Sequence, residues 1–165
     1  MNDMYYRNNT NSYLFSYQKY NGYTTMQENH FHDSFEMYYL LSGKRTYFIK
    51  DNIYTIRKGD LVLINRYDLH RTIDAGVPSH ERYVVNFKPE FFISCDESKF
   101  NSIISLYRKG ISVISLSIKE QSVFEEIFKQ MYNETLNKQS SFDEVNLSYL
   151  IQLLIYAKRY VDLNP

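Results

Sequence analysis

The sequence is poor in residues that cross-link a chain, and it lacks long hydrophobic runs. Among its 165 residues there is one cysteine, Cys95, with no tryptophan and only three prolines. A single cysteine excludes an internal disulfide and fits a reducing compartment. No apolar run has the length of a membrane span, and no secretory leader pattern is present. We therefore expect a cytoplasmic protein with no membrane partner.

An excess of charge of either sign is also missing. The 19 Lys and Arg residues balance 19 Asp and Glu residues, and basic pairs such as Lys44-Arg45 are scattered. Direct binding of nucleic acid by this chain is therefore not expected. Nucleophilic catalysis has little support either, because Cys95 has no evident activating partner and no Ser or Cys is suitably spaced from Asp68 and His70.

Aromatic side chains are abundant. Hydrophobic residues make up 44% of the chain, with 17 Tyr and 11 Phe, which is ample for the core of one domain. The amphipathic ring of tyrosine suits a cavity wall or an interface. The alternative is that most of these tyrosines are structural.

The first half of the chain has the pattern of an all-β domain. Residues 1–12 are polar and rich in Asn, and we expect a flexible N-terminal arm. About eight short strands follow, with turn signals every eight to twelve residues, which is typical of a barrel or sandwich over residues 13–89. The expected strands are 13–17 and 23–26, joined by Asn21-Gly22, then the run that ends at Ser42-Gly43, then 45–50, 53–57, 61–64 and 81–87.

Residues 90–165 change to a helical pattern. We expect a mainly helical segment over 91–109, an extended connector over 111–116, and two helices that start at capping boxes, Ser117 to Glu120 and Ser141 to Glu144. The last helix has an apolar arc wider than one neighbour requires. Either a second subunit covers part of it, or it packs between two parts of its own chain. If a second subunit covers this helix, we expect the contact to be made by the stripe Leu147, Leu150, Ile151 and Leu154.

The stretch from His30 to Gly43 contains the strongest functional signal. His30, His32 and Glu36 are separated by even numbers of residues, so on one strand their side chains share a face. Two imidazoles and a carboxylate are a metal-site composition. They are equally a polar patch in a barrel that binds a small ligand.

The same parity predicts the rest of a ligand site. Tyr38 and Leu40 share the face of Glu36, Arg45 and Tyr47 share a face of the next strand, and Arg82 or Tyr83 closes the far wall. The two arginines are candidates for meeting a carboxylate or a hydroxyl-rich ligand, against the alternative that they face solvent. His80 is expected in a loop or at the surface.

Two motifs resemble those of cupins. The spacing His30-x-His32-x3-Glu36-x6-Gly43 resembles the first cupin motif, and Gly59 to Asp74 resembles the second. In the second motif Gly59 and His70 stand in place, whereas Asn65, Tyr67 and Asp74 depart from it. Resemblance to metal-binding cupins implies metal-ligand roles for His30, His32, Glu36 and His70. It also implies a cupin-like double-stranded β-helix followed by two or three C-terminal helices.

A narrower resemblance covers nearly the whole chain from about residue 13. The run from His30 to Gly43, the segment from Gly59 to His70, the strand 81–87 and the helices near 117–161 resemble the sensor half of AraC-type transcriptional regulators. This resemblance implies a cupin that binds a small effector, helices that dimerise, and DNA binding by a further helix-turn-helix domain. That domain is absent from this chain, and residues 162–165 look like the start of a linker.

The resulting hypothesis is a non-enzymatic sensor of a small polar metabolite, with sugars among the candidates. It is expected to form a homodimer and to need no cofactor, with a divalent metal as the alternative. The predicted ligand-binding residues are His30, His32, Glu36, Tyr38, Arg45, Tyr47, His70 and Arg82. Two rivals remain open: a small metal-dependent cupin enzyme, such as an isomerase or dioxygenase, and a dimeric scaffold with a vestigial pocket.

Overall fold

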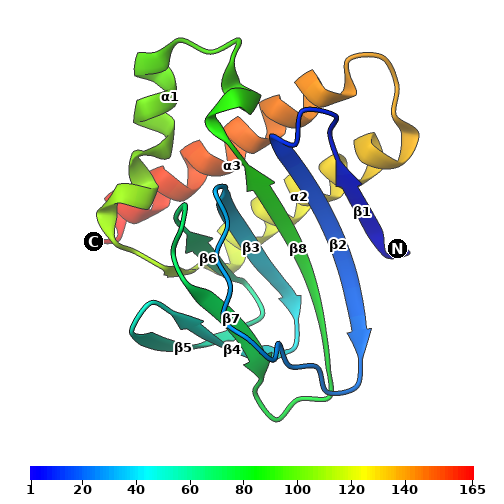
Figure 1. Cartoon of the computed structure of the whole chain (residues 1–165), viewed down its shortest axis with the longest axis vertical. Coiled ribbons are helices and arrows are strands. Elements are labelled where there is room, and N and C mark those ends of the chain that lie inside the picture. Colours follow the sequence, from blue (N-terminus) through cyan, green and yellow to red (C-terminus); the bar gives the residue numbers. More distant parts are fainter.

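The computed structural model describes residues 1–165, and its first part consists of two antiparallel sheets (Figure 1). One sheet has six strands in the order β1-β2-β8-β3-β6-β9, and the other has three in the order β5-β4-β7. The strands are β1 (Met4–Arg7), β2 (Tyr13–Asn21), β3 (Phe35–Ser42), β4 (Lys44–Ile49), β5 (Asn52–Arg57), β6 (Asp60–Ile64), β7 (His70–Asp74), β8 (Ser79–Phe87) and β9 (Val113–Ser115).

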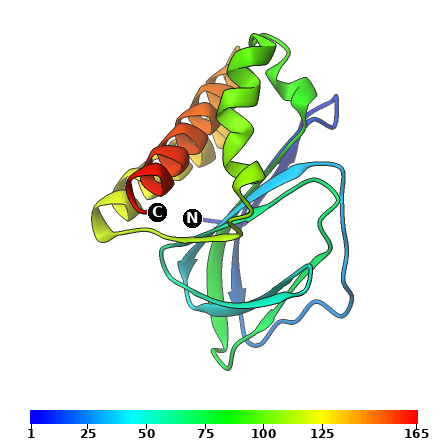
Figure 2. The same cartoon turned by 90° about the vertical axis from the view of Figure 1, so that its left-hand side faces the viewer.

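The helices follow β8 in sequence, with β9 between η2 and α2, and they cover one face of the six-stranded sheet (Figure 2). They are η1 (Pro89–Phe92), α1 (Glu97–Ile103), η2 (Ile104–Lys109), α2 (Ile118–Asn137) and α3 (Phe142–Leu163). The cupin-like, mainly β fold with C-terminal helices is therefore confirmed. None of the helices combines the length and hydrophobicity that crossing a membrane requires.

Two separate cores result, and strand β3 divides them. Its odd-numbered residues Met37 and Tyr39 join a cluster of 29 buried residues between the large sheet and the helices. Its even-numbered residues Tyr38 and Leu40 join a smaller cluster of eight buried residues between the two sheets. This division follows from the alternation of side chains along a strand. The parity predicted for β3 is thus observed, and its even-numbered face points into the barrel.

The two expected capping boxes behave differently. At the start of α2 the Ser117 hydroxyl accepts a hydrogen bond from the Glu120 amide, 3.5 Å away. At the start of α3 Ser141 has a left-handed backbone, φ 61°, and its side chain caps nothing. The connection between the helices is short and reverses the chain, with Lys138 also left-handed. The turn geometry therefore replaces the extended backbone that a capping serine needs.

Two predictions near the N-terminus are wrong. The arm expected to be flexible contributes β1, which pairs with β2 from Met4 opposite Tyr17 to Arg7 opposite Leu14. Residues 23–26 form no strand, because β2 instead pairs with β8 over its whole length. The segment 23–26 is attached to the small sheet by single contacts, such as the hydrogen bond from the Met26 amide to the Thr72 carbonyl, 3.1 Å.

His80 was expected in a loop or at the surface and instead lies in a strand and is buried, with 5% of its area exposed. It lies in β8 and stacks on Tyr20, with ring centroids 4.5 Å apart. Burial, with the nearby charges of Arg45 and Arg82, lowers the pKa of His80 to about 4. A side chain at Gly43 would collide with this region, since its Cβ would lie 2.5 Å from the Ser79 carbonyl oxygen. The turn after β3 therefore requires glycine for space as well as for its φ of +92°.

The predicted dimer stripe lies largely in the chain's own core. Leu147, Leu150 and Leu154 are 9%, 0% and 0% exposed, packed with the helices and the large sheet. They are not available to a second subunit in this fold, so the prediction that they form a dimer surface is wrong. Ile151 is the exception, because it is only partly buried. The wide apolar arc of α3 is explained mainly by packing within the chain.

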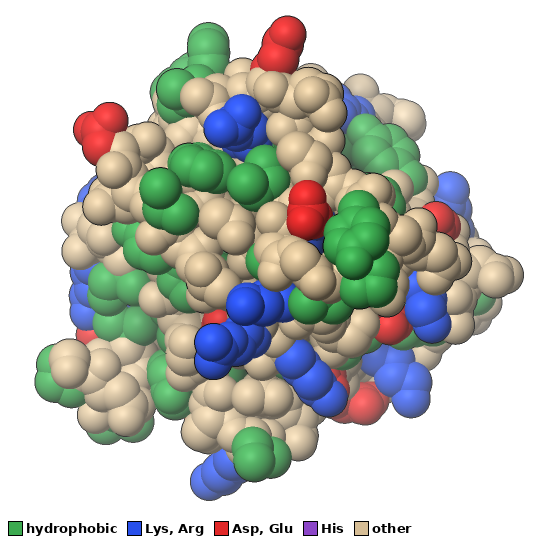
Figure 3. Space-filling model, turned by 90° about the horizontal axis from the view of Figure 1, so that it is seen from below, with side chains coloured by type: hydrophobic (Ala, Val, Ile, Leu, Met, Phe, Trp, Pro, Cys, Tyr) green, Lys and Arg blue, Asp and Glu red, His purple; other side chains and the backbone are tan.

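The surface seen from below carries charges of both signs (Figure 3). Lys and Arg side chains near its centre are interspersed with acidic and hydrophobic side chains. This face therefore shows no uniformly basic surface, in keeping with the formal net charge of zero.

Candidate functional site

A cavity of about 470 Å³ lies beside the small core, in the size range of pockets for small molecules. Strands β2, β3, β4, β7 and β8 contribute to its wall, together with the loop before β3 and the arm. Seven of the eight predicted ligand-binding residues line it: His30, His32, Glu36, Tyr38, Tyr47, His70 and Arg82. The sequence prediction therefore identified seven of the 22 residues that line the cavity.

Arg45 is the exception, because its guanidinium has a structural task. It is 3% exposed and donates hydrogen bonds to the Thr24 carbonyl, 2.7 Å, and to the Thr72 hydroxyl, 3.2 Å. Arg45 thereby holds the irregular segment after β2 against the small sheet, and it does not line the cavity. Its prediction as a ligand-binding residue is not supported by this position.

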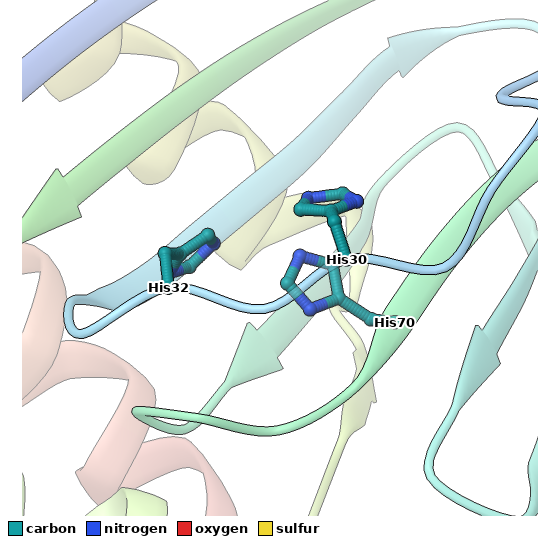
Figure 4. A group of neighbouring side chains, drawn as sticks. All are labelled: His30, His32 and His70. Carbon is teal, nitrogen blue, oxygen red and sulfur yellow. The ribbon is translucent and has the colours of Figure 1, made fainter.

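Three histidines meet at the cavity wall, although they do not come from one strand (Figure 4). His30 and His32 lie in the loop before β3, and His70 begins β7. Two backbone hydrogen bonds join His30 and His70, 3.0 and 2.9 Å long, and their ring centroids are 4.1 Å apart. The prediction that His30 and His32 share a strand with Glu36 is therefore wrong, but the side chains still converge.

Glu36 is the charged centre of this group. Its carboxylate lies 3.1 Å from His32 Nε2, accepts a hydrogen bond from Asn86 Nδ2 at 2.9 Å, and lies 4.0 Å from His70 Nε2. Burial alone opposes ionisation, but the hydrogen bond with His32, the proximity of His70 and the hydrogen bond from Asn86 outweigh it. Together they lower the pKa of Glu36 to about 2.

His32 has the complementary shift. Burial disfavours its charged form, but the hydrogen bond with Glu36, the charge of Glu36 and the contact with the Ser34 carbonyl together outweigh burial and raise the pKa of His32. Its Nδ1 lies 3.0 Å from the Ser34 carbonyl oxygen, so both ring nitrogens face acceptors. An imidazolium satisfies both, and it forms an ion pair with Glu36.

His70 and His30 have ring nitrogens without partners. His70 donates from Nδ1 to the Asp68 carbonyl, 2.7 Å, and its Nε2 has no hydrogen-bond partner. His30 Nδ1 is also buried without a partner, and burial followed by the proximity of His70 lowers the pKa of His30. Each ring therefore has an unpartnered nitrogen that, when unprotonated, is able to accept a hydrogen bond or bind a metal.

The three histidines fit a divalent metal by composition. One ligand atom from each lies within 4.8 Å of the others. Zinc–nitrogen distances of about 2.1 Å in a tetrahedral site place ligand nitrogens roughly 3.4 Å apart. The rings would therefore have to move closer together, and His32 Nε2 would compete with its bond to Glu36. The contact between His70 and Asp68 is the kind of outer contact that orients metal-binding histidines.

Arg82 lies on β8, the strand paired with β3 in the same sheet, and is held by neutral groups. Its guanidinium donates to the Ser16 hydroxyl at 3.3 Å, to Gln18 Oε1, and to the Tyr20 hydroxyl at 3.3 Å. It also lies 5.8 Å from the ring centroid of Tyr38. Tyr83, the alternative that parity left open for the far wall, points to the helices and stacks on Phe128.

The sequence analysis missed several wall residues. Asn86 lies on the same face of β8 as Arg82, so parity along the strand could have identified it. Lys88 follows that strand and pairs with Asp33 at 2.9 Å. Tyr5 and Arg7 come from β1. The tyrosines of this segment allow an arm that folds over the cavity mouth, but a flexible arm was the prediction.

Comparisons with known proteins agree with this fold. The family model described as the AraC-like ligand binding domain matches residues 14–154. Comparison with curated proteins gives no match. Among solved structures, apo ToxT K231A from Vibrio cholerae is similar over 96% of this chain and 59% of its own, with 18% identity and a TM-score of 0.63.

Two cupins match less well. A cupin protein from Bacteroides fragilis, BF4112, has a TM-score of 0.43 and 19% identity over 47% of this chain and 66% of its own. The Cnp3 cupin domain of Schizosaccharomyces pombe has a TM-score of 0.47 and 9% identity over 61% of this chain and 63% of its own. The chain thus spans less than two thirds of each of these three structures. Because the family model covers most of the sequence, the chain belongs to the AraC-like ligand binding domain family.

Proposed function

We propose that this chain is the effector-sensing part of a transcriptional regulator and binds a small polar metabolite in the cavity between its two sheets. One observation carries the proposal: the cavity wall includes buried polar atoms that have no partner in the protein. The Tyr38 hydroxyl and His70 Nε2 are both unpaired, on side chains only 2% exposed. Unpaired buried polar groups are costly, and a bound polar molecule would satisfy them.

A thermal-shift screen with sugars, sugar acids and other small metabolites tests this proposal. A ligand that binds only the folded chain raises its melting temperature. The matched variants are Ser16→Phe, which places a ring against the cavity, and Ser122→Phe on the exposed side of α2. We expect the shift to persist in Ser122→Phe and to disappear in Ser16→Phe. Stabilisation that both variants retain would place the ligand elsewhere.

Occupancy of the cavity would reach the helices through buried contacts. The Tyr107 hydroxyl in η2 donates to the backbone carbonyl of Glu36, 3.0 Å, and the Tyr39 hydroxyl donates to Glu125 in α2, 2.8 Å. Both contacts connect β3, which carries the site, to the helical layer. A ligand transmits a signal only if it binds one arrangement of these elements more tightly than another. DNA binding would belong to a domain outside this chain.

We further propose a homodimer, through the part of the helical layer that the core leaves open. A groove between α1 and α3 has the side chains of Ile103, Ile151 and Ile155 in its wall, with Lys99 and Lys158 beside them. Sedimentation equilibrium of the chain and of Ile155→Asp tests this proposal. We expect the charge to shift the equilibrium to the monomer, and an unchanged mass would exclude this surface.

A metal-dependent cupin enzyme is the second candidate, and the histidine cluster is the observation that favours it. His30, His32 and His70 would hold the ion, which would supply a Lewis acid to a bound substrate. Elemental analysis of the purified chain and of His70→Ala distinguishes the candidates. Stoichiometric metal that His70→Ala loses would favour the enzyme, whereas metabolite binding in the presence of a chelator would favour the sensor.

A further inference from the structure

The charges around the cavity do not balance within the protein. Three basic side chains line it, Arg7, Arg82 and Lys88, against two carboxylates, Asp33 and Glu36. The carboxylates are both engaged: Asp33 with Lys88 at 2.9 Å, and Glu36 with His32 at 3.1 Å. Neither Arg7 nor Arg82 takes part in any ion pair of the structure. Two guanidinium groups therefore face the same cavity without a carboxylate partner.

Arg82 also has unused hydrogen-bond donors. A guanidinium carries five N–H groups, and Arg82 uses three of them, toward Ser16, Gln18 and Tyr20. Its Nε–H and one Nη1–H are left without an acceptor in the protein. The acceptors already present fix the direction of the group, because Tyr20 also donates to Gln18 at 2.7 Å. Arg82 is thus oriented before any ligand enters, which reduces the entropy cost of binding.

The surroundings of Arg82 extend the same pattern. Tyr38 lines the cavity, and its buried hydroxyl is a further unpaired donor. Arg7 lines the cavity from β1, and its own hydrogen bonds go to neutral groups, the Tyr5 hydroxyl and Asn11 Oδ1. Donors with positive charge line this part of the cavity, whereas the acidic side chains Glu36 and Asp33 are already paired with His32 and Lys88.

From this imbalance we infer that the molecule bound in the cavity carries an anionic group, a carboxylate or a phosphate, and that Arg82 binds this group. The inference rests on the proposed function, since it specifies the chemical class of the effector. Arg7 supplies the second positive charge at the entrance, and the aromatic rings of Tyr38 and Tyr47 contact the remainder of the molecule. A neutral sugar would leave the free N–H groups of Arg82 with weaker, uncharged acceptors.

The first test follows the Nε–H signal of Arg82 by ¹H–¹⁵N NMR of the whole chain, with Arg82→Gln to assign the signal. The probes are sodium acetate, inorganic phosphate and neutral acetamide. We expect a saturable shift with acetate or phosphate and none with acetamide, and the more effective anion identifies the group. An Arg82 signal that responds equally to acetamide, or does not saturate with either anion, would overturn the inference.

The second test uses matched acid and amide pairs from the metabolite panel, measured by calorimetry. Loss of a charge-assisted hydrogen bond in Arg82→Gln should weaken binding of the acid roughly 10- to 100-fold. The control Arg57→Gln, on an exposed strand residue outside the cavity, should leave binding unchanged. Neutral metabolites that bind equally well to Arg82→Gln, with no preference for acids, would refute the anionic class while the sensor proposal stands. Acetate binding at Arg82 without binding of any larger metabolite would count against the sensor proposal alone.

Discussion

Replacement of Glu36 by glutamine tests the electrostatic description of the site. Glu36 is buried and its pKa lies at about 2 instead of 4.5. Since one pKa unit corresponds to about 1.36 kcal/mol, ionised Glu36 stabilises the fold by roughly 3 kcal/mol above its unfolded pKa. This stabilisation is lost as the pH falls from 4.5 toward 2. Glu36→Gln should therefore destabilise the chain by about 2–3 kcal/mol at pH 6, because the amide keeps the shape but not the charge.

The partner of Glu36 limits the effect at high pH. The pKa of His32 is raised above 6.5 in the folded chain. The stability that protonated His32 contributes to the ion pair with Glu36 is therefore fully present below pH 6.5, and it is lost as the pH rises through the folded-state pKa of His32. The difference between wild type and Glu36→Gln should thus be largest between about pH 4.5 and 6.5 and should decrease on both sides. The two shifts describe one ion pair, so their energies are not added.

Urea denaturation from pH 3 to 8, followed by circular dichroism in the presence of EDTA, measures this difference. The control is Glu28→Gln, since Glu28 is exposed and takes part in no ion pair. A destabilisation by Glu36→Gln that is constant across this range would refute the reasoning. It would show that the cost comes from shape or packing and not from the charge of Glu36.

Three further substitutions test other parts of the structure. Arg45→Gln removes a buried guanidinium that ties the segment after β2 to the small sheet, and urea denaturation should show a loss of about 1–3 kcal/mol; an unchanged midpoint would contradict this role. Gly59→Ala should lower the free energy of unfolding by about 1–3 kcal/mol, because Gly59 has a φ of +87° and an added Cβ would meet the Gln121 side chain. In a double-mutant cycle, Gln121→Ala should recover part of this loss, and fully additive effects of the two substitutions would rule out the contact. Tyr107→Phe leaves the buried carbonyl of Glu36 without its donor and should cost about 1 kcal/mol in the same assay, whereas a neutral effect would show that the contact is not needed.

Parts of this site follow directly from strand periodicity. Glu36, Tyr38 and Leu40 share one face because β3 is regular there, and that face is the inner one, as predicted. The same rule holds on β8, where Arg82 and Asn86 face the cavity. Residue spacing predicts which face a side chain occupies wherever the backbone is a regular strand.

The remainder depends on contacts between distant segments, which periodicity does not encode. His30 and His32 lie in an irregular loop. Backbone bonds join His30 to His70, forty residues away, and the His32 carbonyl accepts a hydrogen bond from the Tyr67 amide. Arg45 is an arginine on a strand that borders the cavity, as a ligand-binding residue would be, yet its guanidinium donates a hydrogen bond to the Thr24 carbonyl instead. The pairing of β1 with β2 likewise arises from the tertiary fold and not from local propensity.

The same distinction explains α3. Its apolar stripe is correctly located, but an amphipathic pattern does not say whether the partner surface belongs to the same chain or to a second one. In this fold the partner is the chain's own sheet and α2, which bury Leu150 and Leu154 completely. Only residues on the margin of the stripe, such as Ile155, remain for a dimer.

The most direct test of the central claim is calorimetric titration of this chain with the best stabilising metabolite, in the presence of a chelator. We predict saturable binding of one molecule per chain, abolished by Ser16→Phe and retained by Ser122→Phe. Binding that both variants retain, or binding that requires a divalent metal, would contradict the assignment of this cavity as the effector site.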